Sequence, residues 1–209
     1  MPGSKKLTVN VYPLTPARWK DFVTLFGPRG ACAGCWCMEP RQTRADWERY
    51  KGPQNRQKMR RLVHDGKRPP GLLAYVGRTP VGWISIEPRE VFSKLSRSRV
   101  LAPVDDKAVW SIVCFFVNKD YRGRGISVAL IEGAVDYARS KGARIVEGYP
   151  VEPKKLPVPP VFAFTGLAAA YRRARFSEVA RRSSTRPIMR RLLRRKSLTS
   201  KRPATKPPM

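Results

Sequence analysis

The chain has 209 residues, enough for one domain with a substantial hydrophobic core, and 42% of them are hydrophobic, so the body is expected to fold. Its 43 Lys and Arg residues outnumber 15 Asp and Glu residues, and the net charge of +28 favours anionic partners without selecting one class of them. No stretch reaches the ~18 apolar residues that span a membrane, and the N-terminus is too briefly apolar for a signal peptide, so a cytoplasmic protein with reduced thiols and no membrane partner is expected.

The N-terminal third predicts one strand followed by two helical regions. Residues 7–12 alternate apolar and polar side chains, as a half-buried strand does, and residues 16–26 place apolar side chains at helical spacing. Glycine and proline then end this helix and lead into a cysteine-bearing loop at residues 32–38. Residues 43–63 predict a helix that is interrupted by a glycine–proline pair.

The middle of the chain predicts a hairpin, a long loop and a central strand. Residues 71–76 and 81–86 are rich in apolar side chains and are joined by a short turn, whereas residues 87–106 are polar and aperiodic. Residues 108–117 are apolar on both alternating faces, which is typical of a central strand covered on both sides. Strict alternation places Val109, Val113, Phe115 and Val117 on one face and Trp110, Ile112, Cys114 and Phe116 on the other.

The last part of the body predicts a helix, a strand and a proline-rich connector. Small and apolar side chains recur at helical spacing over residues 125–138, and residues 143–149 predict the next strand. The connector at residues 150–160 carries five prolines, which exclude a regular helix from it. A short helix and two strands are expected to complete the body, at residues 166–173, 176–180 and 186–193.

The chain is expected to divide into one domain, residues 1–193, and a tail, residues 194–209. The tail is basic and proline-bearing and has almost no apolar residues, so it is expected to be disordered. Its charge favours weak, nonspecific contacts with nucleic-acid phosphates, because aromatic side chains that would stack on bases are missing from it.

One motif, residues 122–127, follows the central strand and begins the next helix. Free backbone N–H groups and the positive end of the helix dipole meet at such a point, and glycine lets an anion approach the backbone closely. A P-loop is excluded because no Gly-Lys-Ser/Thr follows at the required spacing. A dinucleotide fingerprint lacks its third glycine, where Val128 stands, although Glu147 lies at a suitable distance downstream. The motif reads Arg122-Gly123-Arg124-Gly125-Ile126-Ser127.

This segment resembles the signature of the GNAT superfamily of N-acetyltransferases, Arg/Gln-x-x-Gly-x-Gly/Ala, with Arg122, Gly125 and Ser127 at the three defined positions. Ser127 departs from the pattern but is small enough for the same backbone path. The resemblance covers residues 71–193 and includes a helix that ends in Tyr171-Arg172-Arg173-Ala174-Arg175-Phe176, where many members read Tyr-x-x-x-Gly-Phe. The segments at residues 83–88, 92–103 and 185–190 resemble an uncharacterised bacterial branch of the family.

The resemblance implies an α+β fold, with a mixed, largely antiparallel sheet flanked by helices in a single domain. It implies acetyl-CoA as cofactor, with the pyrophosphate at Arg122, Gly123, Arg124, Gly125, Ile126 and Ser127. Because the fourth and fifth strands of the family splay apart, it also implies that backbone groups near Phe115, Phe116 and Val117 pair with the pantetheine arm. Relatives often dimerise, so a homodimer is expected.

Acetyl transfer to an amine requires a neutral amine and a coenzyme A thiolate that can leave, and positioning supplies much of the catalysis. Tyr171 matches the family position from which a phenol protonates the departing sulfur. A phenol with a pKa near 10 keeps its proton at neutral pH. The general base is obscure, because the central strand carries no carboxylate. Glu87 and Glu152 are the preferred candidates; Glu147 and His64 are further ones.

The cysteine loop has two interpretations. Cys32-x-x-Cys35-x-Cys37 has a spacing at which thiolates share a zinc ion, but a fourth ligand is available only from Cys114 or His64, both distant in sequence. The preferred interpretation has no metal. It treats the segment as the loop that covers the acceptor cleft in the family, with Trp36 and Met38 as an apolar wall; buried thiols in a packed loop are an equal alternative.

The sequence therefore predicts an acetyl-CoA-dependent N-acetyltransferase that acts on a primary amine by direct attack in a ternary complex. A small molecule and a peptide remain open as the source of that amine. The alternative is a noncatalytic acyl-CoA-sensing or nonspecific nucleic-acid-binding module on the same fold. The missing base favours this alternative, whereas Tyr171 and the phosphate-binding motif argue against it.

Overall fold

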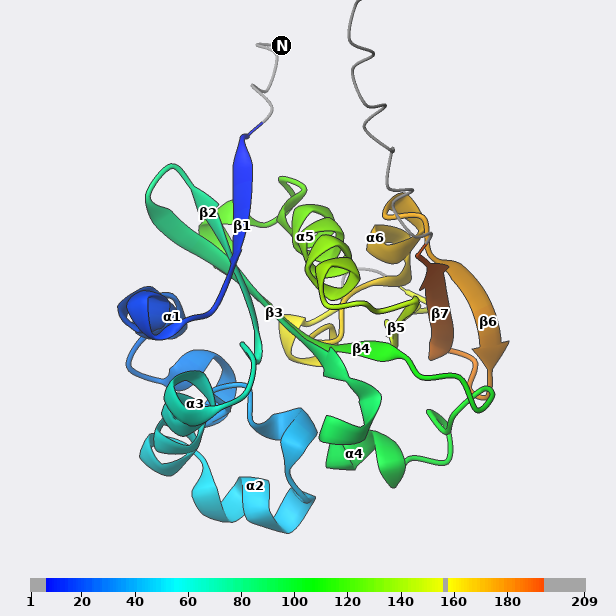
Figure 1. Cartoon of the computed structure of the whole chain (residues 1–209), viewed down its shortest axis with the longest axis horizontal. Helices are drawn as coiled ribbons and strands as arrows, with labels where there is room; N and C mark the ends of the chain where they lie inside the picture. The colour runs from blue at the N-terminus through cyan, green and yellow to red at the C-terminus, as the bar shows by residue number, and fades with distance from the viewer. Residues whose placement is uncertain (1–6, 156–157, 194–209) are drawn as a thin grey trace, which may run out of the picture.

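Seven strands form one sheet in the order β1-β2-β3-β4-β5-β7-β6 in the computed structural model, which describes residues 7–155 and 158–193 (Figure 1). Every neighbouring pair is antiparallel except β4 and β5, which run parallel. The predicted mixed, largely antiparallel sheet is therefore confirmed. The strands are β1 (Val9–Pro13), β2 (Gly71–Val76), β3 (Thr79–Pro88), β4 (Trp110–Val117), β5 (Ile145–Gly148), β6 (Ser177–Arg181) and β7 (Pro187–Leu192).

Helices cover both faces of the sheet, as Figure 1 shows. On one face α5 packs across β1, β2, β3 and β4 and contacts α6, and on the other face α1 packs on β3. The helices are α1 (Trp19–Phe26), α2 (Arg44–Tyr50), α3 (Pro53–Asp65), α4 (Ser93–Ser96), α5 (Ile126–Ser140) and α6 (Ala168–Arg173). Within the described residues, no helix is long and apolar enough to cross a membrane.

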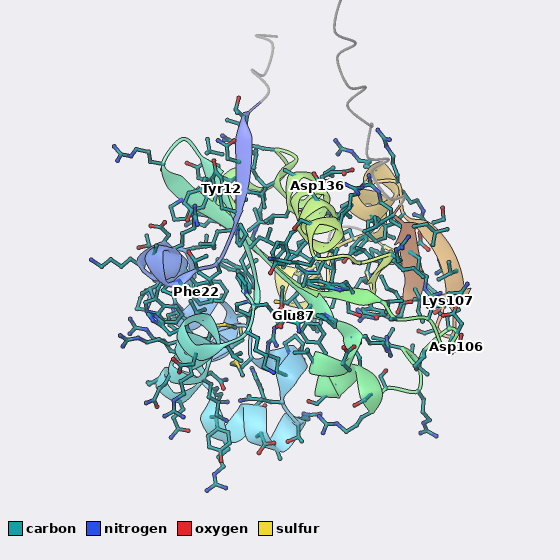
Figure 2. The ribbon with its side chains drawn as sticks, viewed as in Figure 1. Tyr12, Phe22, Glu87, Asp106, Lys107 and Asp136 are labelled. Carbon is teal, nitrogen blue, oxygen red and sulfur yellow. The ribbon has the colours of Figure 1, made fainter. Side chains whose placement is uncertain are left out.

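Two hydrophobic cores lie on the two faces. The α5-side core joins α5 and α6 to the sheet, and Gly133 allows α5 to approach Val11 of β1 because a Cβ there would press on the valine. The N-terminal core joins the sheet to the N-terminal layer, residues 14–65. Phe22, Phe26 and Trp83 form an aromatic cluster in it, with ring centroids 4.0 to 6.1 Å apart. Figure 2 shows Phe22 on α1 in this layer.

A β-bulge in β4 corrects the predicted alternation of its side chains. The register with β3 changes from Ser85↔Cys114 to Ile86↔Ile112, so Val113 is an extra residue on β4. Val113 and Cys114 therefore both face the N-terminal core, whereas Ile112 faces the α5-side core. A bulge bends its strand. This one lies where β4 makes its last pair with β5, Ile112↔Gly148.

The predicted long loop at residues 87–106 is more structured than expected. Its first two residues extend β3, and a 3-10 turn (Arg89–Val91) and α4 follow. Phe92 and Leu95 anchor this segment, because both side chains are buried in the N-terminal core. A helix of four residues is too short to show helical periodicity, so the pattern could not reveal it.

The predicted division of the chain at residue 193 stays a prediction. One sheet with two cores spans the described residues, but the basic tail at residues 194–209 lies outside them, as do residues 1–6. The expected contact of that tail with nucleic acid therefore lies outside the described residues too.

Candidate active site

A turn rich in glycine joins β4 to α5. Gly123 and Gly125 have φ of 72° and 83°, the left-handed region in which glycine is unstrained. A Cβ at either position would meet nothing within 4 Å, so the backbone here is open to a ligand. Gly125 is the N-cap of α5, and no side chain caps that end. Because the first N–H groups of a helix have no intrahelical acceptor, they are available to an anion.

Two exposed arginines flank this turn. The Nε of Arg122 donates to the carbonyl of Val117 at 3.2 Å, and the guanidinium of Arg124 lies 5.9 Å from the ring centre of Tyr121. Ile126 turns its side chain into the α5-side core and offers a ligand only its backbone. The glycines, the arginines and the start of a 15-residue helix together fit a pyrophosphate.

The second part of the site is a seam between β4 and β5, which we define as the gap beyond the pair Ile112↔Gly148. The two strands pair only over the first three residues of β4. The N–H of Phe115 points into the seam and donates to the carbonyl of Phe164 at 2.6 Å. The N–H of Asn118 points the other way, to Val81 on β3.

Backbone groups alternate along a strand, so this pattern assigns the three residues predicted to hold a pantetheine arm. Phe115 and Val117 turn their backbone groups toward the seam. Phe116 turns its own toward β3. The geometry thus suits Phe115 and Val117 for the predicted role and leaves Phe116 without it, while the Phe115 N–H already has a partner in Phe164.

Tyr171 on α6 lies at the edge of the seam. Its ring packs so closely on Gly148 that a Cβ there would overlap it, and its hydroxyl donates to the carbonyl of Thr165 at 3.3 Å. The side chain is fully buried. Burial raises the pKa of Tyr171 well above its usual value, with a smaller contribution from Tyr149, so the phenol keeps its proton at neutral pH.

Glu87 is a buried carboxylate at the end of β3, and Figure 2 shows it in the interior of the molecule. It forms an ion pair with Arg41, whose guanidinium also donates to the carbonyl of Pro70. A row of polar side chains crosses the sheet from this point, because paired residues share a face. The row runs Glu87, Ser111, Glu147 and Arg190 across β3, β4, β5 and β7.

Glu152, the other preferred base, lies in a different setting. It forms ion pairs with Arg172 and Arg181, and roughly a third of its side chain is exposed, 31%. The hydrogen bond from Arg172, then that from Arg181, lowers the pKa of Glu152, because both arginines stabilise its charged form. A carboxylate so paired is a weaker base than an unpaired one.

The cysteine loop lies in the N-terminal layer against β4. Trp36 and Met38, the predicted acceptor wall, are 3% and 6% exposed and pack in the N-terminal core. Trp36 stacks on Phe26 with centroids 5.7 Å apart and also lines a cavity of about 310 Å³ together with Arg56. Within the described residues, no group of three or more His, Cys, Asp or Glu side chains has a metal-binding arrangement.

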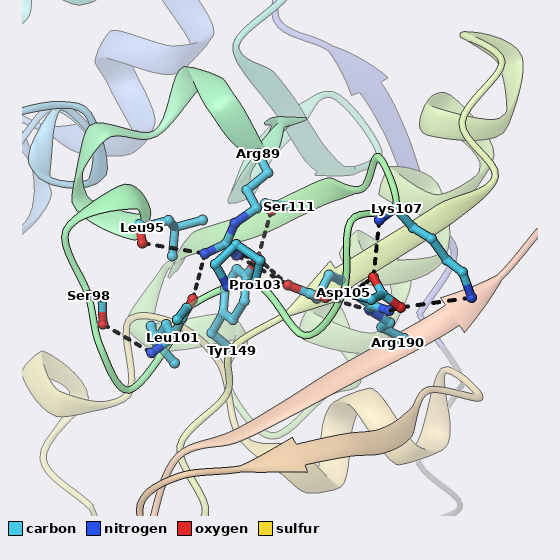
Figure 3. Close-up of polar contacts among 12 residues, drawn as sticks. Arg89, Leu95, Ser98, Leu101, Pro103, Asp105, Lys107, Ser111, Tyr149 and Arg190 are labelled. Carbon is cyan, nitrogen blue, oxygen red and sulfur yellow. Dashed lines mark hydrogen bonds and ion pairs between the residues drawn. The ribbon is translucent and has the colours of Figure 1, made fainter.

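A buried network beneath the segment after β3 escaped the sequence analysis (Figure 3). Arg89 donates to Glu147 at 3.2 Å, to the Tyr149 hydroxyl at 2.6 Å and to the carbonyl of Leu101 at 2.5 Å. Arg190 donates to Glu147 at 2.5 Å. The network fixes residues 89–105 across β4 and β5. Its three charged members, Arg89, Glu147 and Arg190, lie tens of residues apart, so no local pattern could have identified it.

The chain matches the model of the acetyltransferase (GNAT) family over residues 35–153. This match covers more than half of the chain and, unlike the predicted core of residues 71–193, includes the cysteine loop from Cys35 onward. An uncharacterised N-acetyltransferase of Methanocaldococcus jannaschii is 45% identical over 47 residues, which are 22% of this chain and 21% of that protein. The chain thus matches only about a fifth of that relative's length.

Solved structures share the fold. A GNAT-family acetyltransferase from Listeria monocytogenes superposes with a TM-score of 0.54 at 12% identity, over 91% of this chain and 98% of that one. The PaiA N-acetyltransferase from Thermoplasma acidophilum, solved in complex with coenzyme A, gives a TM-score of 0.51 at 12% identity, over 90% and 100% of the two chains.

Proposed function

The chain belongs to the GNAT family of acetyltransferases, and on that premise we propose that it transfers the acetyl group of acetyl-CoA directly to a primary amine held in the same complex. The observation that carries this proposal is the open, glycine-built start of α5 at the end of a strand that leaves its neighbour. Such a start binds phosphates, and such a seam presents to an extended ligand backbone groups that are not paired with a neighbouring strand.

Residues on both sides of the seam would hold the cofactor. The turn from Arg122 to Gly125 would bind its pyrophosphate, and backbone groups of Phe115 and Val117 would bind its pantetheine arm. Acetyl-CoA supplies the acetyl thioester when bound. When the cofactor binds, the hydrogen bond from the Phe115 N–H to the carbonyl of Phe164 must break.

Residues 164–165 hold, through hydrogen bonds, both a proposed cofactor-binding group and the proposed general acid. The carbonyl of Phe164 accepts from the Phe115 N–H, and the next carbonyl, that of Thr165, accepts from the Tyr171 hydroxyl. A single displacement of residues 164–165 therefore frees a cofactor-binding group and the proposed acid together. In this proposal Tyr171 donates its proton to the leaving sulfur, which the raised pKa permits across the neutral range.

We assign the base to Glu87 in preference to Glu152. Glu87 is buried on the same face of the sheet as Cys114. It lies two residues after Ser85, the β3 residue that pairs with Cys114. Glu152 is tied to two arginines that lower its pKa and weaken it as a base, whereas Glu87 is paired with one arginine, Arg41. Positioning of the amine against the N-terminal layer, with Trp36 and Met38 as its apolar wall, would supply the rest of the rate.

The test is calorimetric titration with acetyl-CoA, followed by a screen of small and peptide amines for release of coenzyme A thiol. Gly125→Glu adds a negative charge where the pyrophosphate would lie, and Gly142→Glu is its matched control. Gly142 follows the other end of α5 with φ of 84°, and a Cβ added there would also meet nothing within 4 Å, so the two variants carry similar strain. Arg122→Ala is compared with Arg139→Ala, which removes an arginine in the last turn of α5.

Micromolar binding that is lost in Gly125→Glu and Arg122→Ala, but kept in both controls, is the expected result. Equal binding by all five proteins would place the cofactor elsewhere. Binding without thiol release for any amine would favour the noncatalytic acyl-CoA-sensing alternative, and no binding by the wild type would refute the proposal.

A further inference from the structure

Three of the four cysteines form a chain of thiols between the cysteine loop and β4. The Sγ atoms of Cys37 and Cys114 lie 3.0 Å apart, although 77 residues separate them in sequence. Cys35 lies two residues before Cys37 in the same loop, and its thiol donates to the carbonyl of Gly30 at 3.5 Å. Cys37 and Cys114 are buried and Cys35 is partly buried, whereas Cys32 is exposed. The thiols thus lead from the edge of the loop into the interior.

The backbone of the loop holds this arrangement at a conformational cost. Ala31, Ala33, Trp36 and Cys37 all have positive φ, of 64°, 50°, 42° and 54°. A residue other than glycine is strained at positive φ, because its Cβ comes too close to the backbone. Packing of Trp36 in the aromatic cluster offsets this cost. Strain of this kind concentrates at functional sites, because the surrounding structure must over-determine it.

The β4 bulge completes the site. If β4 kept strict alternation through Val113, with no bulge, Cys114 would share the face of Ile112 and point toward α5. The bulge turns it toward the N-terminal core, where it meets Cys37. The loop and the strand are therefore shaped independently to bring these two sulfurs together.

The three thiols differ in reactivity along the chain. The largest influence on the pKa of Cys35 is a hydrogen bond from Cys37, which lowers that pKa to about 6. Burial acts in the opposite direction but is the smaller effect. When protonated, the Cys35 thiol can donate to the carbonyl of Gly30 at 3.5 Å. Burial, then the hydrogen bond with Cys114, raises the pKa of Cys37. Cys35 is therefore a better nucleophile at neutral pH than Cys37 and also a better leaving group.

We propose that Cys35, Cys37 and Cys114 form a redox modification site that reacts with hydroperoxides and ends in a Cys37–Cys114 disulfide. The Cys35 thiolate attacks the peroxide oxygen and, with one proton taken up, gives a sulfenic acid and an alcohol, or water from hydrogen peroxide. The Cys37 thiol attacks that sulfenic sulfur and releases water. The Cys114 thiol then attacks the Cys37 sulfur of the Cys35–Cys37 bond, and Cys35 leaves as the thiol after taking the proton.

The sum is two thiols and one peroxide giving one disulfide, one alcohol and one water, so electrons and atoms balance. The final bond needs the two sulfurs to approach by about 1 Å, since a disulfide is about 2.05 Å long. It would tie residues 35–38 to β4 beside Phe115. The site does not depend on acetyl transfer, so its test reads out covalent bonds.

The test treats the reduced full chain with hydrogen peroxide and maps thiols and disulfides by peptide mass spectrometry over time. We expect loss of two thiols per chain, early trapping of Cys35 sulfenic acid by a 1,3-dione, and a Cys37–Cys114 link that dithiothreitol reverses. Cys35→Ser should slow formation of that link at least tenfold, and Cys114→Ser should stop at a Cys35–Cys37 bond. Cys32→Ser is the matched control and should react as the wild type does.

Several results would overturn the site. Oxidation of Cys32 ahead of Cys35, or equal rates at all four thiols, would remove the proposed order. Irreversible oxidation without any Cys37–Cys114 link would remove the disulfide. About one zinc ion per purified chain, with the three thiols protected until a chelator is added, would replace the redox site by a metal site. The wild-type time course decides these points even if a cysteine variant fails to fold.

Discussion

Tyr171→Phe tests the proposed acid directly, because it removes one oxygen and keeps the ring. That ring contacts Phe115 and Phe176 edge-on, with centroids 6.0 and 5.2 Å away, and these contacts remain. The lost hydroxyl makes one neutral hydrogen bond, to Thr165. Loss of such a bond costs about 1 kcal/mol of unfolding free energy. Loss of a general acid instead lowers turnover about 10²- to 10⁴-fold, with acetyl-CoA binding unchanged.

The assay is steady-state release of coenzyme A thiol, with urea unfolding as the measure of stability. Tyr137→Phe is the matched control, since the Tyr137 hydroxyl is buried on α5 and has no hydrogen-bond partner within the described residues. It should change neither turnover nor stability. Because burial raises the Tyr171 pKa, activity should not fall through ionisation of this group between pH 7 and its usual pKa of 10. Equal turnover in wild type and Tyr171→Phe would refute the assignment.

Three further predictions concern stability. Glu147→Gln should cost about 3–5 kcal/mol in urea unfolding, because it leaves Arg89 and Arg190 short of a buried partner, whereas the surface control Glu178→Gln should stay within about 0.5 kcal/mol. Gly133→Ala should lower stability, because its Cβ would lie 2.6 Å from Val11. Overpacking of this kind costs about 1–3 kcal/mol, whereas the better helix propensity of alanine gains about 1 kcal/mol. A stabilised variant would contradict the close packing of α5 on β1. Because the pKa of Glu152 is lower in the folded state, its charged form contributes to folding stability above the unfolded pKa, and this contribution is lost as the pH falls through the folded pKa. Glu152→Gln should therefore be less stable than the wild type at pH 7 and equally stable in acid, as measured by urea unfolding.

The candidate cofactor site could be proposed from the sequence because its parts are local. The proposed phosphate-binding turn is six consecutive residues, and its glycines and helix start suit an anion wherever the turn lies. Tyr171 was assigned through the resemblance of its helix ending to that of the family. What the pattern could not show is that Phe164 and Thr165, just after the proline-rich connector, accept hydrogen bonds from the Phe115 N–H and the Tyr171 hydroxyl.

The order of strands and helices along the chain and the apolar cover on both faces of the central strand are properties that the sequence alone determined, whereas the fold class followed from the resemblance to the GNAT family. They depend on the spacing of apolar residues, which every strand and helix longer than a turn repeats. The structure decided what depends on pairing between distant strands: the bulge at Val113, the direction of Cys114, and the buried network around Glu147. A bulge shifts the register by one residue, so the side chains beyond it point to the opposite faces of the sheet from those that strict alternation predicts. The shift depends on pairing with the neighbouring strand, so the sequence pattern of β4 by itself could not predict it.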